Sequence, residues 1–366
     1  MRIIITYLTG IGNTILFMPT LRLLRKKFSD AYITVIVRSQ ANKELIDSIN
    51  CADETIVLNE KNPPGIFGKL KVLQQIRRQR YDISITPFPL NRIEFNILSF
   101  ILRAKRRLAC RYHTGFYQTF NFLHTNFIEA STDRHEIDHN LELLRLLAIQ
   151  YTDEERKISL PLTDEQLIFA RQLLSARGTQ KGQLLVGIHP GSISDAGDLL
   201  KRWPADKYAR LVEHLVVKYG ARILLFGVQA EQPLLEQINN AIEGRGIVLT
   251  DTSIMQTAAI ISLLDLFIAN DSGPMHIAVA VQTPTIAFFG PSDPRRNGHE
   301  NEVHTIIRKE LDCSPCKKYP HYQYNGSSYD CIFSDDRYGQ CLQMIQVKDV
   351  LQIIENKYGK IIKMTN

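Results

Sequence analysis

Most features that would place this chain outside the ordinary globular class are missing from its sequence. No apolar run approaches the roughly 20 residues that a membrane-spanning helix needs. Only Met1 and Arg2 precede the apolar run at 3–8, too few for a secretory signal peptide, so we expect a cytoplasmic protein. Six cysteines in 366 residues are too few for a disulfide scaffold. Glycine (20) and proline (15) are close to average, which excludes collagen-like and low-complexity chains.

The composition that remains is that of a globular protein with more than one domain. Hydrophobic residues make up 44% and charged residues 22% of the chain, and at roughly 150 residues per domain its length predicts two domains. The charge is uneven. Residues 1–150 carry 21 Lys/Arg against 13 Asp/Glu, a net of +8, whereas residues 151–366 carry 23 against 25, a net of −2. The basic first half indicates an anionic partner, unless these charges only cover solvated faces.

Apolar strand-like runs alternate with amphipathic helix-like stretches in both halves. The predicted strands are 3–8, 32–37, 55–58, 82–86, 106–110, 184–190, 221–227, 246–251, 266–271 and 284–290. Continuous apolar strands separated by helices are typical of parallel sheets covered on both faces. We therefore predict an α/β fold of two doubly wound Rossmann-like domains, 1–170 and 171–345, that face a central cleft. A C-terminal helix in 346–366 could pack back toward the first domain.

The loop after the first predicted strand contains Gly10, Gly12 and Asn13. Glycines let a backbone approach a ligand, and the helix N-terminus that follows offers N–H groups to anionic or polar oxygens. A dinucleotide-binding G-x-G-x-x-G motif would need glycine at Ile15, and strand two ends in Arg38 instead of an acid, so only an NADP-dependent oxidoreductase keeps any support. The alternative is that Asn13 is merely the N-cap of the first helix.

The strongest motif is NDSGPMH (270–276), directly after the apolar strand LFIA. Asp271 or Ser272 can cap the next helix, and Gly273 allows close backbone approach. The N–H groups of the first turn could then hold a phosphate near His276. Two further glycine loops follow neighbouring strands: FFGPSDP (288–294), and HPGS (189–192), which leads to the cations of KRWP (201–204). Such cations suit a diphosphate.

In this order and spacing, HPGS…KRWP, the loop from Gly227 to Glu231, NDSGPMH and FFGPSDP resemble glycosyltransferase family 9, the ADP-heptose:lipopolysaccharide heptosyltransferases and their relatives. The opening RIIITYLTGIGNTILFMPT and the late CSPC…CL resemble the family as well, so the resemblance covers nearly the whole chain. It implies a GT-B fold with the acceptor in the first domain and an ADP-heptose-like nucleoside-diphosphate sugar in the second. It also implies inverting, cofactor-independent transfer to a lipopolysaccharide core or related surface glycan.

The resemblance assigns roles to individual residues of the donor site. Lys201 would neutralise the diphosphate, Ser192 would hydrogen-bond to it, and Asp271 would hold the hydroxyls of the sugar. Glu231 would grip the ribose. The full donor-binding set is Gly191, Ser192, Lys201, Glu231, Asp271, Ser272, Gly273 and His276, and developing charge on the leaving diphosphate explains why a cation and aimed N–H dipoles belong there.

One position departs from the family. Asn13 stands where the well-known heptosyltransferases have an aspartate that acts as general base, and an amide has no useful basicity. Either Asn13, with Gly10 and Gly12, only orients the acceptor while another residue takes the proton, or the chain is a catalytically silent nucleotide-sugar-binding protein. His135, Glu136, Asp138 and His139 are candidate replacement bases; alternatively, they form a solvated helix start with Asp138 as its cap.

Cys313, Cys316, Cys331 and Cys341 are the candidates for a metal site. The spacing of the first pair suits a structural Zn or Fe, and iron is used by some protein-glycosylating relatives of the family. The alternative is four reduced cysteines that pack an irregular loop. No metal is expected to take part in catalysis.

The basic run at 103–107 straddles a predicted helix end and a strand start, where cations favour the helix dipole. No aromatic interleaving or nucleic-acid motif accompanies it, so we expect no nucleic acid. The basic first domain fits an anionic glycolipid or glycan acceptor and a peripheral contact with the inner membrane.

Overall fold

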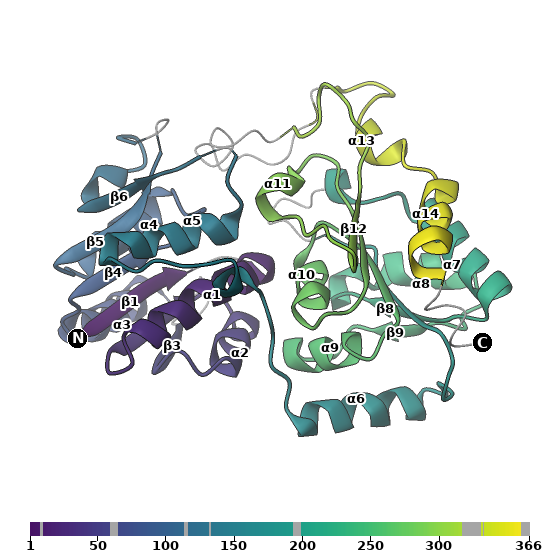
Figure 1. Ribbon diagram of the computed structural model, residues 1–366, viewed down its shortest axis with the longest axis horizontal. Coiled ribbons are helices and arrows are strands. Elements are labelled where there is room, and N and C mark those ends of the chain that lie inside the picture. The colour runs from purple at the N-terminus through teal and green to yellow at the C-terminus, as the bar shows by residue number, and fades with distance from the viewer. Residues whose placement is uncertain are drawn as a thin grey trace. The chain divides into compact units, whose positions relative to one another are not determined.

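The computed structural model describes residues 1–7, 10–58, 65–112, 116–131, 133–192, 199–316, 331 and 333–359 (Figure 1). These residues form two compact units. The first contains Met1–Leu160 together with Arg295–Asn297, and the second contains Pro161–Pro294 and the remaining described residues from Gly298 onward. Each unit has a six-stranded parallel sheet with flanking helices. The predicted α/β class with two parallel sheets is therefore confirmed.

The first sheet has the order β3-β2-β1-β4-β5-β6. Its strands are β1 (Arg2–Tyr7), β2 (Tyr32–Val37), β3 (Glu54–Val57), β4 (Ile83–Thr86), β5 (Arg106–Arg111) and β6 (Asn126–Glu129). The central isoleucines Ile3, Ile4 and Ile5 are fully buried, as expected for a strand covered on both faces. The strand order reverses between β1 and β4, and the carboxyl edge at such a switch point is where ligands of this architecture bind.

Five α-helices of the first unit cover this sheet. They are α1 (Ile11–Lys27), α2 (Gln40–Ser48), α3 (Gly65–Arg78), α4 (Ile93–Ile101) and α5 (Glu136–Leu143). Short 3-10 turns follow at η1 (Asn121–Leu123), η2 (Leu144–Leu147) and η3 (Glu154–Arg156). Ile76 of α3 and Leu98 of α4 pack with Ile4 and Ile36 of the sheet, while α1 contacts α2 and α5.

The second sheet has the matching order β12-β11-β10-β7-β8-β9. Its strands are β7 (Leu185–His189), β8 (Arg222–Phe226), β9 (Ile247–Leu249), β10 (Leu266–Asn270), β11 (Thr285–Phe288) and β12 (His304–Ile307). Strand β7 lies between β10 and β8, so the loops after these three strands share one edge of the sheet. HPGS, the loop from Gly227 to Glu231 and NDSGPMH fall at the ends of these three strands, and FFGPSDP follows the neighbouring β11.

The helices in sequence after Pro161 mostly flank the second sheet, except that Arg295–Asn297 of α11 belong to the first unit. They are α6 (Asp164–Ala176), α7 (Ala205–Tyr219), α8 (Gln232–Asn240), α9 (Ile254–Ile261), α10 (Gly273–Ala280), α11 (Pro294–Asn297), α13 (Gln340–Gln343) and α14 (Val347–Ile353). Shorter turns are η4 (Leu199–Lys201), η5 (Gln229–Glu231) and the π-helical η6 (Ile354–Tyr358). Trp203, stacked on Phe288, lies in the core.

The C-terminal segment adds a layer to the second unit. Helix α14 packs on α7, and Val350, Ile354 and Tyr358 are buried in the same hydrophobic core as Trp203. The division into 1–170, 171–345 and 346–366 stays a prediction about functional domains. None of the helices that the structure describes is both long and apolar enough to cross a membrane.

Candidate functional site

A buried amide organises the carboxyl edge of the second sheet. Asn270, the last residue of β10, is fully buried. Its Nδ2 donates to the carbonyl oxygens of Pro190 (2.7 Å) and Gly191 (3.1 Å). Its Oδ1 accepts from the backbone N–H of Trp203 (2.9 Å) and the hydroxyl of Tyr208 (3.1 Å). One side chain thus uses both donors and both lone pairs to join the loop after β7, the segment after Lys201 and the end of β10.

Asp271 forms an ion pair at the same edge. Lys201 Nζ lies 2.7 Å from Asp271 Oδ2, and the two side chains are 16% and 4% exposed. Burial alone would raise the pKa of Asp271, but the charges of Lys201 and His276, with the nearby Ser292 hydroxyl, outweigh burial and hold that pKa below its usual value. Asp271 is therefore an anion, and Lys201 is positioned by it.

The helix that follows begins without a side-chain cap among the described residues. Ser272 occupies the N-cap position with extended backbone (φ −153°, ψ 167°), yet makes no capping hydrogen bond. Its Oγ instead lies 3.0 Å from His189 Nδ1. Ser272 therefore takes the predicted N-cap position, but its side chain contacts His189 and does not cap the helix. The first turn of α10, which starts at Gly273, keeps N–H groups that suit an anionic oxygen.

A second carboxylate, Glu231, lies after β8. Its Oε2 accepts from the backbone N–H of Val228 (3.1 Å) and lies 3.6 Å from His189 Nε2, while Oε1 lies 3.7 Å from Arg202 Nη2. Burial would raise the pKa of Glu231, but His189, the Val228 N–H and Arg202 together lower it below its usual value. A Cβ at Gly191 would stand 1.9 Å from Glu231 Oε1. Glycine is therefore required there if Glu231 keeps its place.

The remaining predicted donor residues lie along the same edge. Ser192 is buried, and its carbonyl oxygen accepts from Arg202 Nη2 (3.4 Å). His276, in the first turn of α10, is buried with Nδ1 3.2 Å from Nε2 of His299. The structure thus brings all eight predicted donor residues to the carboxyl ends of β7, β8 and β10. It adds Asn270 and His189, to which the motifs gave no role, and it places Arg202, one of the KRWP cations, beside Glu231.

The loop after β1 is partly described, since Leu8 and Thr9 lie outside the described residues. Helix α1 starts at Ile11, with Gly10 in the N-cap position (φ −75°, ψ 172°). Asn13 is therefore the third residue of the helix, and its interpretation as the N-cap is wrong. The Thr14 hydroxyl donates back to the Gly10 carbonyl oxygen (3.1 Å). Gly10, Gly12 and Asn13 stand at the carboxyl end of β1, beside the switch point to β4.

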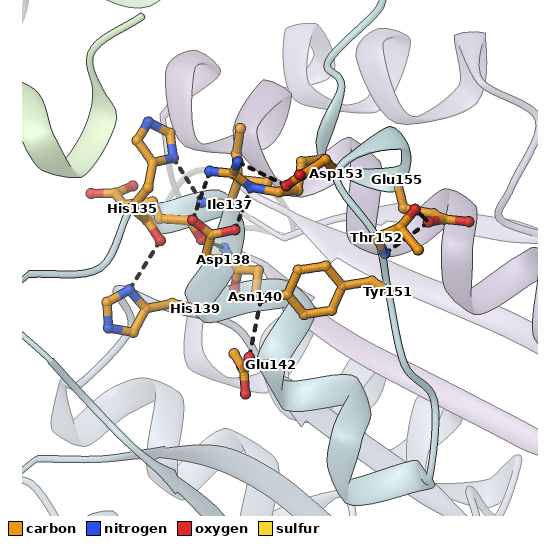
Figure 2. Close-up of polar contacts among 12 residues, drawn as sticks. His135, Ile137, Asp138, His139, Asn140, Glu142, Tyr151, Thr152, Asp153 and Glu155 are labelled. Carbon is orange, nitrogen blue, oxygen red and sulfur yellow. Dashed lines mark hydrogen bonds and ion pairs between the residues drawn. The ribbon is translucent and has the colours of Figure 1, made fainter.

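Figure 2 shows the candidate bases around the start of α5. His135, not Asp138, caps this helix, because its Nδ1 accepts from the Ile137 N–H (3.2 Å). Asp138 receives two hydrogen bonds from Arg156 (2.6 and 2.9 Å). Glu136 forms a buried ion pair with Arg296 (3.1 Å) within the first unit.

His139 completes this group. It stacks on Phe88 with 4.0 Å between ring centroids, and burial lowers its pKa to about 3. Its Nε2 accepts from the Ser131 N–H (3.0 Å), and Nδ1 lies 3.2 Å from the His135 carbonyl oxygen. Both ring nitrogens therefore serve the fold. Together with the capping His135 and the paired Asp138, this favours the structural interpretation of the segment, with His135 in place of Asp138 as its cap.

The four late cysteines are reduced and lie near one another. Burial raises the pKa of Cys316 and, to about 11, that of Cys341, and the neighbouring thiols add to both shifts. The Cys316 thiol donates to the Cys313 carbonyl oxygen (3.1 Å), and Gln340 Nε2 donates to Cys313 Sγ (3.8 Å). Among the described residues, no three His, Cys, Asp or Glu side chains are arranged to hold a metal ion. The contacts of the described thiols favour the packing interpretation, and the metal site at these cysteines stays a prediction.

Two parallel-sheet units, with charged side chains and a helix start at the carboxyl edge of the second, are typical of two-domain α/β enzymes that bind ligands at their strand ends. The sequence matches glycosyltransferase family 9 (heptosyltransferase) over residues 69–325, and the chain belongs to that family. It is therefore a transferase, and the oxidoreductase alternative is dropped. It is 24% identical over 325 residues to lipooligosaccharide heptosyltransferase 2 of Campylobacter jejuni, covering 86% of this chain and 89% of the relative.

Two solved structures show the same fold. The family 9 glycosyl transferase of Veillonella parvula superposes with a TM-score of 0.75 at 22% identity, covering 99% of this chain and 97% of that one. The Escherichia coli ADP-heptose lps heptosyltransferase II gives a TM-score of 0.74 at 18% identity, covering 99% and 98%. The GT-B architecture implied by the sequence motifs is therefore confirmed.

Proposed function

We propose that this protein is an inverting glycosyltransferase. It moves a heptose-like sugar from an ADP-heptose-like nucleoside-diphosphate sugar to a lipopolysaccharide core or related surface-glycan acceptor. The donor occupies the domain at 171–345 and the acceptor the domain at 1–170. Family membership and the ADP-heptose in the name of the E. coli relative support the donor class. The single observation that carries the proposal is the Lys201–Asp271 pair beside the uncapped start of α10.

The donor site suits departure of a diphosphate. In the transfer step the acceptor oxygen attacks the anomeric carbon, the bond from that carbon to the diphosphate oxygen breaks, and the diphosphate leaves with the bonding electron pair. Lys201 and the N–H groups of α10 then face the growing negative charge, which fixed dipoles stabilise in a site with little water. Asp271 holds Lys201 in place and accepts from sugar hydroxyls. Glu231, kept anionic by its surroundings, is suited to accept from the two ribose hydroxyls.

The acceptor proton needs a base other than Asn13. An amide oxygen can orient a hydroxyl but does not take its proton near neutral pH. The four candidate replacement bases all make structural contacts, namely His135, Glu136, Asp138 and His139. Asn13 at the β1 edge therefore orients the acceptor, and the proton passes to a group of the substrate or to solvent. The transfer itself needs no cofactor.

The donor claim is tested by calorimetry with ADP and ADP-heptose, using UDP-glucose and NADPH as comparisons. We expect ADP and ADP-heptose to bind and NADPH not to. Binding of ADP-heptose without hydrolysis or transfer would support the alternative, a catalytically silent nucleotide-sugar-binding protein. Absence of ADP-heptose binding would contradict both the proposed transferase and the silent nucleotide-sugar-binding protein.

The basic first domain also suits work at the cytoplasmic face of the inner membrane, in peripheral contact with it. Residues 1–150 carry the excess of 21 Lys/Arg over 13 Asp/Glu, and an anionic lipid-linked acceptor would be attracted by that charge.

A further inference from the structure

Exposed apolar side chains gather on one part of the first unit. Among the described residues, six of the exposed large hydrophobic side chains fall between positions 93 and 122. They are Ile93 (45% exposed), Phe100 (50%), Ile101 (37%), Tyr117 (73%), Phe120 (40%) and Phe122 (44%). We call this set the aromatic surface. The other exposed large hydrophobics are scattered over the described chain, and scattered ones need no explanation, whereas a cluster does.

The two segments that carry the aromatic surface are joined. Asn96 Nδ2 of α4 donates to the Thr119 carbonyl oxygen (2.8 Å), and α4 contacts η1. Tyr117 and Phe122 have ring centroids 6.0 Å apart, and Phe120 and Phe122 5.8 Å apart. The helix α4 and the turn η1, which carry or adjoin these side chains, therefore lie next to each other, and α4 also packs on β4 and β1 of the first sheet.

Helix α4 is apolar on two opposite sides. Phe95 and Leu98 are buried toward the sheet, while Ile93, Phe100 and Ile101 are exposed at positions i, i+7 and i+8. A helix that covers a soluble domain normally turns polar residues outward. The outward stripe of α4 therefore fits a second apolar environment.

Arginines surround this surface. Arg107 lies over the Phe100 ring (5.7 Å to the centroid), and Arg111 lies over the rings of Phe116 (5.7 Å) and Phe127 (4.8 Å). Arg92 and Arg103 flank α4 at its two ends and are exposed. The acidic side chains nearby are already paired, Glu94 with Arg92 and Glu129 with Arg111.

We propose that the aromatic surface docks the protein on an anionic lipid bilayer. Aromatic rings prefer the boundary between headgroups and acyl chains, and arginines can extend from there to lipid phosphates. Apolar insertion and basic attraction are the two contributions that stable peripheral binding requires. A second copy of the chain is a poorer occupant, because a two-fold contact would bring arginine against arginine. The docking proposal rests on the proposed function in one respect, because a lipid-linked acceptor would lie in such a bilayer.

Vesicle flotation of the full chain tests this docking directly. We expect binding to phosphatidylglycerol–phosphatidylethanolamine vesicles, weak binding to phosphatidylcholine vesicles, and a decline at high salt. Phe100→Ser/Phe122→Ser and Arg92→Glu/Arg111→Glu should each weaken binding about tenfold or more, since each basic residue near such a surface contributes about fivefold. The matched controls are two pairs of the second unit that are at least as exposed, Val217→Ser/Ile168→Ser and Arg210→Glu/Lys218→Glu.

Circular dichroism establishes that each variant is folded. Wild-type protein that does not float with phosphatidylglycerol vesicles would overturn the proposal, as would folded surface variants that bind like the controls. Variants that turn a dimer into a monomer in sedimentation and float unchanged would show an interface between copies instead. Transfer to a delipidated acceptor should be equal in all variants, so failure of the proposed transferase activity is seen separately from failure of docking.

Discussion

At the scale of single residues, the second unit is organised by pairs whose members depend on each other. Asp271 stays ionised in a buried place because Lys201 is 2.7 Å away. Glu231 stays ionised because His189, Arg202 and the Val228 N–H surround it, and Gly191 leaves the space that it needs. The motifs identified these residues as candidate site residues. They did not identify their partners, because the pairs join positions up to 70 residues apart.

Replacing Lys201 by alanine should weaken ADP-heptose binding. Loss of one charge-assisted contact costs about 1.5–3 kcal/mol, which is about tenfold to more than a hundredfold in affinity. Asp271→Ala should have a similar effect, because it releases Lys201. Calorimetry with ADP-heptose measures both. The control is Lys218→Ala, which removes an exposed ion pair with Glu355 in the same unit. Unchanged affinity in both site variants would remove the proposed donor site.

Two substitutions test the role of Asn13, one by adding a carboxylate and the other by removing the amide. Asn13→Asp puts a carboxylate where relatives of this family have their base, so turnover should change by about an order of magnitude or more. The rate rises if proton removal is slow, and falls if a carboxylate repels an anionic acceptor. Asn13→Ala should lower turnover and leave donor affinity unchanged. Initial rates measured at saturating donor and acceptor concentrations distinguish these outcomes. If neither variant alters turnover, Asn13 has no part in the reaction.

At the scale of elements, the inner strands and the edge strands β3 and β9 were predictable, whereas the other two edge strands were not. The ten strands that the sequence predicts are present, because each is built around apolar residues and flanked by turn or helix patterns. The edge strands β6 (NFIE) and β12 (HTII) were missed: each has four residues, mixes polar with apolar side chains and is only partly buried. The interpretation of Asn13 as an N-cap placed the cap of α1 three residues late, because Gly10 rather than a polar side chain occupies that position.

The loops at the donor edge should depend on Asn270 for their stability. Asn270→Ala leaves two backbone carbonyl oxygens, the Trp203 N–H and the Tyr208 hydroxyl without that partner, and each orphaned buried group costs about 1–3 kcal/mol. We expect a drop in Tm of roughly 2–4 °C per kcal/mol lost. Asn240→Ala, at an exposed asparagine in α8, should be nearly neutral. A thermal melt in which both variants match the wild type would contradict the role given to Asn270.

Elemental analysis tests whether the four late cysteines bind a metal ion. If Cys313, Cys316, Cys331 and Cys341 bind metal, protein purified without chelator should carry about one Zn or Fe per chain, and Cys316→Ser should lose it. Cys51→Ser, at a thiol of the first unit remote from this segment in sequence, is the control. Well-folded protein with clearly less metal than one ion per chain would leave the cysteines as packing residues.

At the scale of the whole molecule, the two units have the same strand order, and the proposed function assigns the donor to the second and the acceptor to the first. The second brings its charged side chains to one sheet edge, and the first presents Asn13 at its own switch point and an apolar, arginine-lined surface elsewhere. Fold and family could be predicted because the glycine loops fall at strand ends. The aromatic surface could not be predicted, since the exposure of its side chains depends on which side of α4 packs on the sheet.

The central claim is tested most directly by transfer from ADP-heptose to a heptose-deficient lipopolysaccharide core. The E. coli heptosyltransferase II is the positive control for donor and acceptor quality. We predict one ADP released for each heptose added, measured by chromatography and mass spectrometry, with equal rates in the presence of EDTA. The new linkage should have the anomeric configuration opposite to that of the donor in NMR spectra. Retention of the donor configuration, or no ADP release over a range of truncated cores on which the control is active, would contradict the account.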